Sequence, residues 1–160
     1  MKKMILGASL FGVATLGLMT IDTAKAASTT AQALAVVTAA INITQVADLD
    51  FGSSVQGDVA KTVAPADATA AEFTVSGQPS TAYTITLPAD GTITMITGGG
   101  ATADEQIAVD TFASSPAAGA NGMLDGTGSE TLKVGATRAA LSGTQVAGNY
   151  AATFTVDVVY

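Results

Sequence analysis

The sequence predicts an all-β fold, an antiparallel sandwich of about seven to nine short strands. The first observation behind this prediction is an alternation of apolar and polar residues along several segments. In residues 73–76 and 83–87, threonine or serine separates the apolar side chains at every second position. A period of two is typical of a strand that is buried on one face and exposed on the other.

Turn residues between these segments are the second observation. Gly77-Gln78-Pro79, Asp90-Gly91 and Asn121-Gly122 lie between or beside alternating stretches. Glycine, asparagine and aspartate tolerate the positive φ that tight turns require. We therefore expect chain reversals at these places, with a hairpin over residues 87–93.

The third observation is that no segment after the first 26 residues keeps an i, i+3, i+4 apolar pattern with helix caps. Strands are expected instead at residues 41–44, 49–51, 93–95, 107–109 and 132–134, and a long final strand is expected over residues 149–160. Together these features indicate one immunoglobulin-like sandwich domain over residues 38–160. Its expected core consists of Phe51, Phe73, Tyr83, Ile85, Leu87, Phe154 and Val156.

Residues 1–26 have the features of a secretory signal peptide. Lys2 and Lys3 precede an apolar run over residues 4–19, and Ala24 and Ala26 occupy the two positions that a signal peptidase reads. The run is shorter than the roughly 20 residues of a membrane-spanning helix. We expect cleavage after Ala26, passage through the periplasm, and a mature chain at the cell surface or outside the cell with no membrane span.

Charge and cysteine content narrow the range of partners. After the expected cleavage only Lys61, Lys133 and Arg138 remain as basic residues, against twelve acidic ones. A chain without a basic patch is a poor ligand for nucleic acid or anionic lipid. The sequence has no cysteine. The exported domain therefore depends on packing and backbone pairing and not on disulfides.

The residue types argue against an enzyme. Histidine and cysteine are both absent, which excludes a Ser-His-Asp or Cys-His centre and removes the usual zinc ligands. Asp48 and Asp50 are two apart on one strand face, where we interpret them as solubilising residues. Two loops carry acidic residues, which are the ligands that calcium prefers. The spacing of the acidic residues in these loops matches no known calcium-binding motif. We predict no catalytic residue, no cofactor and no required metal. The acidic residues of the two loops are Asp104, Glu105, Asp125 and Glu130.

The segment 27–37 fits the globular domain less well. It is rich in alanine and threonine, and no turn residue separates it from the first expected strand. As an extended chain it presents either Leu34 and Val36, or Ala33, Ala35 and Val37, as its apolar set, and the pattern does not choose between these registers. A loose tail, or simply the start of the first strand, explains the segment equally well.

Several strand and turn motifs resemble an exported bacterial family known as domain of unknown function 4402. The motifs are Leu49-Asp50-Phe51-Gly52, Ala71 to Gly77, Tyr83 to Pro88, Leu132 to Thr137, Ala147 to Tyr150 and Thr153 to Tyr160. The resemblance implies the fold and brings no catalytic residue. The organisation is more distantly similar to fimbrial and pilus subunits, in which an N-terminal extension completes the sandwich of a neighbour. The usual disulfide and the large alternating residues of a donor strand are missing here.

These features lead to two functional hypotheses. The first is a structural subunit of an extracellular filament, fimbria-like fibre or surface layer, in which copies of the chain assemble by strand addition. A periplasmic chaperone and an outer-membrane assembly protein are the further partners that the pilus resemblance implies. The second is a monomeric exported binding module for a carbohydrate or surface ligand, aided by calcium. In the first hypothesis the donor residues are Ala33, Leu34, Ala35, Val36 and Val37, and the acceptor residues of the final strand are Tyr150, Phe154, Val156, Val158 and Tyr160.

Overall fold

Nine strands and one short 3-10 turn form the regular structure of the computed structural model, which describes residues 26–160. The predicted signal peptide thus lies outside the described residues except for Ala26. The elements are β1 (Asn42–Ala47), β2 (Lys61–Val63), β3 (Ala71–Ser76), β4 (Ala82–Thr86), β5 (Ile93–Ile96), η1 (Ala103–Glu105), β6 (Gln106–Ser115), β7 (Gly119–Met123), β8 (Ser129–Arg138) and β9 (Asp157–Val159).

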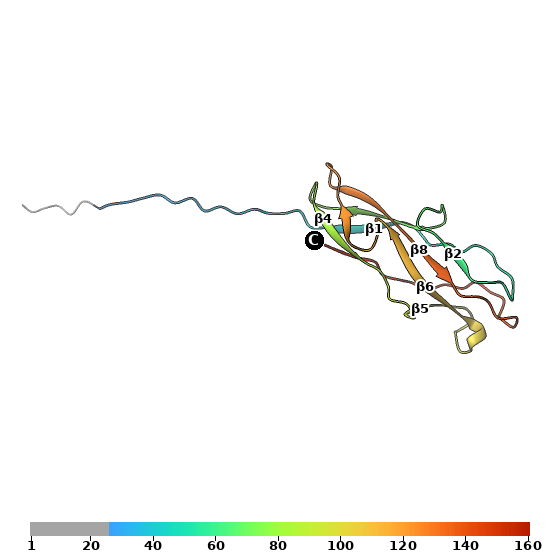
Figure 1. Cartoon of the computed structure of the whole chain (residues 1–160). Coiled ribbons are helices and arrows are strands. Elements are labelled where there is room, and N and C mark those ends of the chain that lie inside the picture. The colour runs from blue at the N-terminus through green and yellow to red at the C-terminus, as the bar shows by residue number, and fades with distance from the viewer. Residues whose placement is uncertain (1–25) are drawn as a thin grey trace, which may run out of the picture. The chain divides into compact units, whose positions relative to one another are not determined.

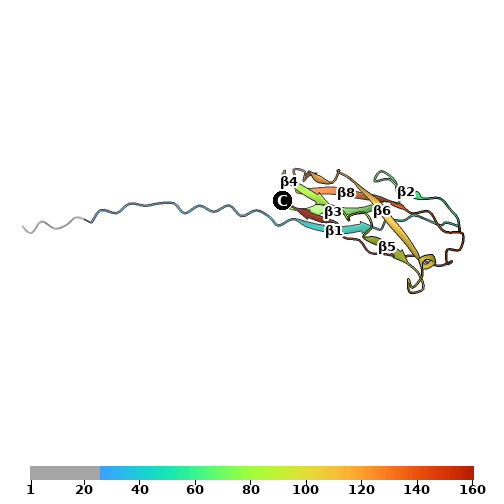
Figure 2. The ribbon, with the colours of Figure 1, turned by 60° about the horizontal axis from the view of Figure 1, so that its bottom comes forward.

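The strands form two antiparallel sheets (Figures 1 and 2). The larger sheet has the order β1-β3-β8-β6-β5, and β2 also pairs with β8. The smaller sheet has the order β7-β4-β9. The prediction of an all-β antiparallel sandwich is confirmed, and the strand number lies within the expected range. Among residues 26–160 no helix is long and apolar enough to span a membrane.

The core lies between the two sheets. Val75 and Leu132 of the larger sheet and Tyr83 and Ile85 of the smaller sheet belong to one buried cluster. A second cluster forms around Phe51 beside β2 and β6. The seven residues predicted for the core all belong to these clusters: Phe51, Tyr83, Ile85 and Val156 are buried, whereas Phe73, Leu87 and Phe154 are partly buried and pack against them.

Asn121-Gly122 is not a turn, and this part of the prediction is wrong. Both residues lie within β7, where Gly122 is the direct cross-strand partner of Tyr83. A β-carbon at Gly122 would overlap the Tyr83 ring. Glycine is therefore required here because an aromatic ring covers the backbone, which gives a strand glycine a packing role.

The hairpin predicted over residues 87–93 is also wrong, although its turn is present. Gly91 has a φ of +77°, and the Thr92 N–H donates to Ala89 O. The strands on either side do not pair, because β4 belongs to the smaller sheet and β5 pairs with β6 in the larger one. The turn residues therefore mark a crossing between sheets.

The long final strand is shorter than predicted. Only β9 pairs with β4 in a ladder, and Ala151 makes one isolated bridge with Ile96. Alternation of faces is present from residue 153 to residue 158: Phe154, Val156 and Val158 are buried or partly buried, and Thr153, Thr155 and Asp157 are exposed. It does not extend to Ala152 and Tyr160, which the period of two places on the same face as Phe154 but which are exposed. The stretch expected as a strand at residues 49–51 belongs to no strand, although the Asp50 N–H donates to Thr69 O. The strand β2 was not predicted.

The chain divides between Ala35 and Val36 into two units. Of the first unit the structure describes residues 26–35, which contain no helix or strand and are exposed. The second unit holds all nine strands, and its first residues, 36–41, also lack regular structure.

Candidate functional site

An open groove runs between two segments of the second unit that lie outside the named strands, residues 49–56 and residues 145–154. It consists of a larger hollow of about 670 Å³ and a smaller one of about 40 Å³. The two hollows share Leu49, Phe51 and Met95 and are therefore continuous. We call this feature the groove, and the two segments are its walls.

The floor of the groove is apolar where the hollows meet. Met95 comes from β5, and Ile107 and Val109 come from the start of β6. The smaller hollow has only apolar lining residues: Leu49, Phe51, Ile93, Met95, Val109, Ala152 and Phe154. These side chains form part of the sandwich interior that the walls leave uncovered.

The walls carry main-chain groups without main-chain partners. Ala152 to Val156 make no backbone–backbone hydrogen bond, and neither do residues 51–54. In the wall at residues 49–56 the Gly52 N–H donates only to the carboxylate of Asp50, at 2.7 Å. Unpaired main-chain groups along an extended segment are the feature that allows another strand to pair with it.

The end of the groove beside residues 145–150 is polar, and the buried side-chain amide of Gln145 fixes its shape. Gln145 is 5% exposed, and its Nε2 donates to Asp104 O at 2.7 Å and to Gln106 O at 3.1 Å. Tyr150 Oη lies 2.8 Å from Asp104 O and 2.7 Å from Val146 O. These bonds tie the wall at residues 145–150 to η1 and β6, so this end of the groove has a fixed shape.

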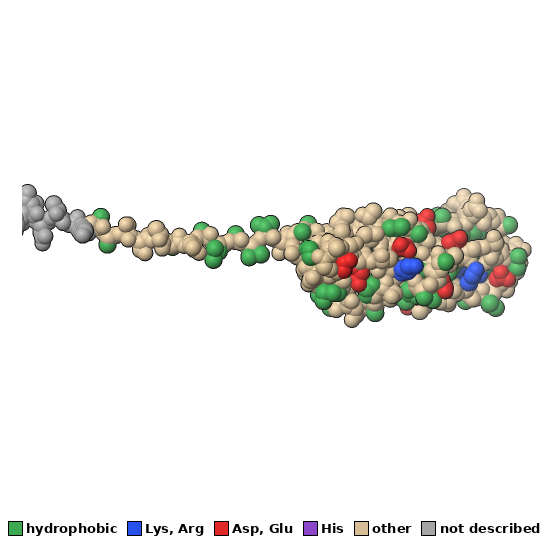
Figure 3. Space-filling model, turned by 90° about the horizontal axis from the view of Figure 1, so that it is seen from above, with side chains coloured by type: hydrophobic (Ala, Val, Ile, Leu, Met, Phe, Trp, Pro, Cys, Tyr) green, Lys and Arg blue, Asp and Glu red, His purple; other side chains and the backbone are tan. Residues whose placement is uncertain are grey.

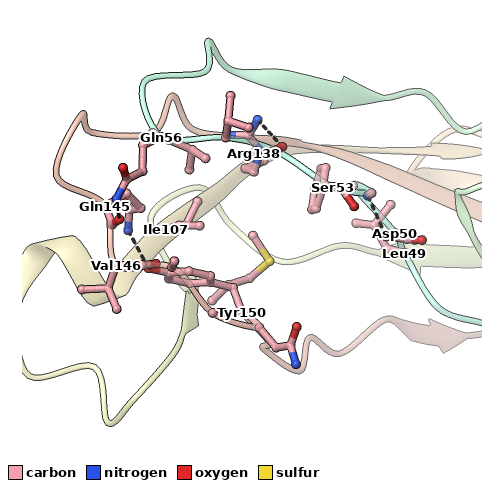
Figure 4. Close-up of a pocket in the computed structure, with 18 residues that line it drawn as sticks. Leu49, Asp50, Ser53, Gln56, Ile107, Arg138, Gln145, Val146 and Tyr150 are labelled. Carbon is pink, nitrogen blue, oxygen red and sulfur yellow. Dashed lines mark hydrogen bonds between the residues drawn. The ribbon is translucent and has the colours of Figure 1, made fainter.

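Arg138, the last residue of β8, lines the same end. It is 3% exposed, and its guanidinium donates to Ser54 Oγ, Val59 O and Ala139 O. Figure 4 places Arg138 beside the wall that contains Ser53, and Tyr150 on the opposite wall. The sequence analysis named Arg138 only as one of three basic residues. Its neighbours, Thr137 and Ala139, give no sign that this charged side chain is buried.

The predicted donor residues lie on an exposed, extended segment. Leu34 is 87%, Val36 95% and Val37 91% exposed, and Ala33 and Ala35 are exposed as well. Figure 3 shows hydrophobic side chains along this segment. No strand or helix includes it.

The predicted acceptor residues are spread along the final segment. Tyr150 and Phe154 line the groove, Val156 belongs to the core, and Val158 lies in β9. Phe154 contacts Phe112 and Phe73, with ring centroids 5.2 Å and 6.4 Å apart. Tyr160 lies outside the groove, 43% exposed, and its hydroxyl accepts the Gln78 N–H at 2.5 Å.

The acidic loops are occupied by their own hydrogen bonds. Asp125 Oδ1 accepts the Thr127 hydroxyl and the N–H groups of Thr127 and Ser129, and these bonds, the hydroxyl first, lower the pKa of this exposed carboxyl. Glu130 accepts the Tyr83 hydroxyl and the Met123 N–H. Within the part of the chain that the structure describes, no group of three acidic side chains is arranged to hold a metal ion.

The acidic residues of the other loop, Asp104 and Glu105, also accept hydrogen bonds from nearby groups of the chain. Glu105 accepts the N–H groups of Ala101 and Thr102, and Asp104 accepts the Ser142 hydroxyl. Asp48 and Asp50 are exposed, as expected, and each accepts one local hydrogen bond. These carboxylates therefore shape their loops.

Of the comparisons with known proteins, the one with protein-family models found a match. A family model described as Domain of unknown function (DUF4402) matches residues 62–160, more than half of the chain. The match covers β3 to β9 and the last two residues of β2, and it leaves β1 and the extended segment outside it. No curated protein matches the chain, and no solved structure does.

Proposed function

The chain belongs to the Domain of unknown function (DUF4402) family, and from the groove in its sandwich we propose that it is a structural subunit of an extracellular filament or surface layer. Residues 27–37 of one copy insert as a strand into the groove of the next copy. The proposal assigns the chain no catalytic role.

One observation carries this proposal: the groove combines an apolar floor with unpaired main-chain walls. Ala152 to Val156 and residues 51–54 offer N–H and C=O groups that no other backbone takes up. Ile93, Met95 and Val109 form the floor between them. An inserted strand would pair with a wall and cover the floor, which is the mode of recognition called strand addition.

The extended segment has the properties of the missing strand. Eleven residues in β geometry span roughly 36 Å, at about 3.3 Å per residue. Leu34, Val36 and Val37 are almost fully exposed and gain from burial. The segment has no proline, so each residue can donate one main-chain hydrogen bond.

The polarity of the segment also matches the groove. Its first half, with Ser28, Thr29 and Thr30, is polar, and its second half, from Leu34 to Val37, is apolar. The groove is polar at residues 145–150 and apolar beside Ala152 and Phe154. If polar residues of the segment contact the polar part of the groove, the polar half of the segment lies beside residues 145–150.

Export and assembly partners follow from this arrangement as further parts of the proposal. The signal peptide expected at residues 1–26 would deliver the chain to the periplasm. A subunit with an open apolar groove risks non-specific association before it meets the next copy. We therefore expect a periplasmic chaperone to cover the groove and an outer-membrane assembly protein to receive the subunit.

The test compares assembly of the mature chain with that of two double variants. Leu34→Asp with Val36→Asp puts two charges into the half of the segment that meets the apolar floor. Ala117→Asp with Ala118→Asp adds the same charge at exposed residues between β6 and β7. Light scattering after size exclusion and electron microscopy measure assembly, and circular dichroism checks the fold.

We expect multimers that dissociate on heating from the wild type and from the Ala117/Ala118 variant. The Leu34/Val36 variant should be a folded monomer, with a melting temperature below that of the assembled wild type, because assembly stabilises the folded state by mass action. The proposal is wrong if that variant assembles like the wild type. A wild-type chain that stays monomeric at high concentration would instead favour the monomeric binding module.

A further inference from the structure

Hydrogen bonds join the two walls at the polar end of the groove. Gln56 Nε2 donates across the groove to Gln145 O at 2.5 Å, and both residues line the larger hollow. Just after Gln56 in the chain, two main-chain hydrogen bonds of 2.8 and 3.1 Å join residues 57–58 to residues 141–142. Figure 4 shows Gln56 and Gln145 next to each other. We call this place, where Gln56 meets Gln145, the closed end of the groove.

The closed end is held firmly on both sides. Arg138 fixes the chain before and after Gln56, because its guanidinium donates to Ser54 Oγ at 3.1 Å and to Val59 O at 3.2 Å. On the other side, the side chain of Gln145 is buried and donates to carbonyl oxygens of η1 and of the start of β6. A strand that enters the groove could pass this end only by breaking several of these bonds.

The rest of the groove has no such connection between its walls. Within residues 26–160, no hydrogen bond joins residues 49–55 to residues 146–154. The walls approach each other there through apolar side chains, since Leu49 and Phe154 line the same small hollow. In the part of the chain that the structure describes, hydrogen bonds therefore block the groove at its polar end and leave the remainder free for a strand.

The length of the extended segment places its first residue at the closed end. With Leu34 over the apolar floor beside Ala152, the residues before Leu34 follow the wall toward Gln145. Ala27 precedes Leu34 by seven residues, and Gln145 precedes Ala152 by the same number. Seven extended residues span about 23 Å. The wall bends at Gly148, so its two ends are no farther apart than that. Residues in front of Ala27 would have to pass through the closed end.

We propose that the groove selects a chain end: it accepts a segment of another copy whose free N-terminus is Ala27, and it excludes a segment with residues in front of Ala27. The inference rests on the proposed function, because the inserted strand is the ligand. An N-terminal extension pushes the strand away from the closed end by its own length. Leu34 and Val36 then leave the apolar floor and lose the burial that favours binding. Removal of residues 1–26 thus becomes a condition for assembly, and an unprocessed precursor cannot donate its segment.

The experiment compares three synthetic peptides on one acceptor. The acceptor is the mature chain with Leu34→Asp and Val36→Asp, in which we expect an empty groove. The first peptide has the sequence of residues 27–37. The second carries Gly-Ser-Gly-Ser in front of Ala27, and the third carries the same extension after Val37, so that the two are matched in length and composition. Nitrogen-15 correlation spectra follow the backbone signals of the walls during each titration.

We expect the first and third peptides to bind with equal affinity, and the second to bind about tenfold more weakly or worse. The same comparison is made in whole mature chains by light scattering. Gly-Ser-Gly-Ser in front of Ala27 should leave the protein monomeric, whereas the same insertion between Val37 and Thr38 should still allow multimers. Circular dichroism checks that both chains keep the wild-type fold.

The outcomes separate this inference from the proposed function. Equal affinity of all three peptides would overturn selection of a chain end and leave strand addition intact. A loss of affinity confined to the third peptide would show that the strand inserts in the opposite direction, and would overturn the inference as well. If none of the peptides shifts the wall signals at millimolar concentration, the proposed function itself fails.

Discussion

Replacing Phe154 with alanine tests how the final segment is held to the sandwich. Phe154 lies in the stretch without main-chain pairing, so side-chain packing is its main attachment. Its ring meets Phe112 at 5.2 Å and Phe73 at 6.4 Å, the latter edge-to-face with an interplanar angle of 79°. Truncation of a fully buried phenylalanine costs about 3–5 kcal/mol, and each aromatic pair accounts for about 0.5–1.5 kcal/mol. Because Phe154 is only partly buried, we expect a loss of about 2–4 kcal/mol.

The assay is urea unfolding followed by circular dichroism, since the chain has no tryptophan. The Leu34→Asp, Val36→Asp background is used because we expect it to be monomeric, so that unfolding is not coupled to assembly. Thr155→Ala is the matched control, because Thr155 is the exposed neighbour on the same segment, and its effect should stay within about 0.5 kcal/mol. A loss below about 1 kcal/mol for Phe154→Ala would refute the idea that packing of this ring holds the segment.

Three further predictions concern residues outside the groove. Burial, together with the hydrogen bond and charge of Glu130, raises the pKa of the Tyr83 hydroxyl; above about pH 10 the unfolded state therefore loses this proton first. The free energy of unfolding should then fall as the pH rises, and it should fall less steeply in Tyr83→Phe when urea unfolding is repeated between pH 8 and 11. The pKa of Asp125 is lowered in the folded state, so its effect on stability depends on pH in the opposite direction. The stabilisation is present above the unfolded pKa of this carboxyl and is lost as the pH falls through the lower folded value. The free energy of unfolding of Asp125→Asn should therefore depend less steeply on pH in acid, and equal slopes for the variant and the parent would contradict this. Gly122→Ala should cost about 1–3 kcal/mol, because the new methyl group meets the Tyr83 ring; thermal melting measures it, and a variant as stable as the parent would show that the ring moves aside at no cost.

Alternation along the chain predicted which side chains are buried better than it predicted which strands pair. In β4, Tyr83 and Ile85 point into the core and Thr86 is exposed, as the period of two requires. Burial is a local consequence of side-chain polarity in an extended chain. Pairing depends on which segment lies alongside, and nothing near Asp90 records that β4 and β5 belong to different sheets.

The groove was predictable only in part. Tyr150 and Phe154 of one wall were among the predicted residues, but the wall at residues 49–56 and the buried Arg138 were not predicted as parts of a site. The wall looks like an ordinary loop with glycine and serine. The burial of Arg138 depends on contacts with residues about 80 positions away, Ser54 and Val59. Such long-range contacts leave no periodic signal in the sequence.

In the proposed assembly, the stretch from Ala152 to Val156 and the exposed N-terminal segment would be the two halves of one pairing between copies. Side chains of Phe154 and Val156 alternate with exposed residues as in a strand, yet ladder bonds also require a neighbouring backbone at about 4.8 Å. Residues 26–41 belong to no strand, so in the proposed assembly each chain would offer one strand and one acceptor groove. When the contacting surfaces differ, the contact between copies is heterologous, and repetition generates a ring or an open filament instead of a closed dimer. This asymmetry is the physical reason to expect a filament or layer from strand addition in this chain.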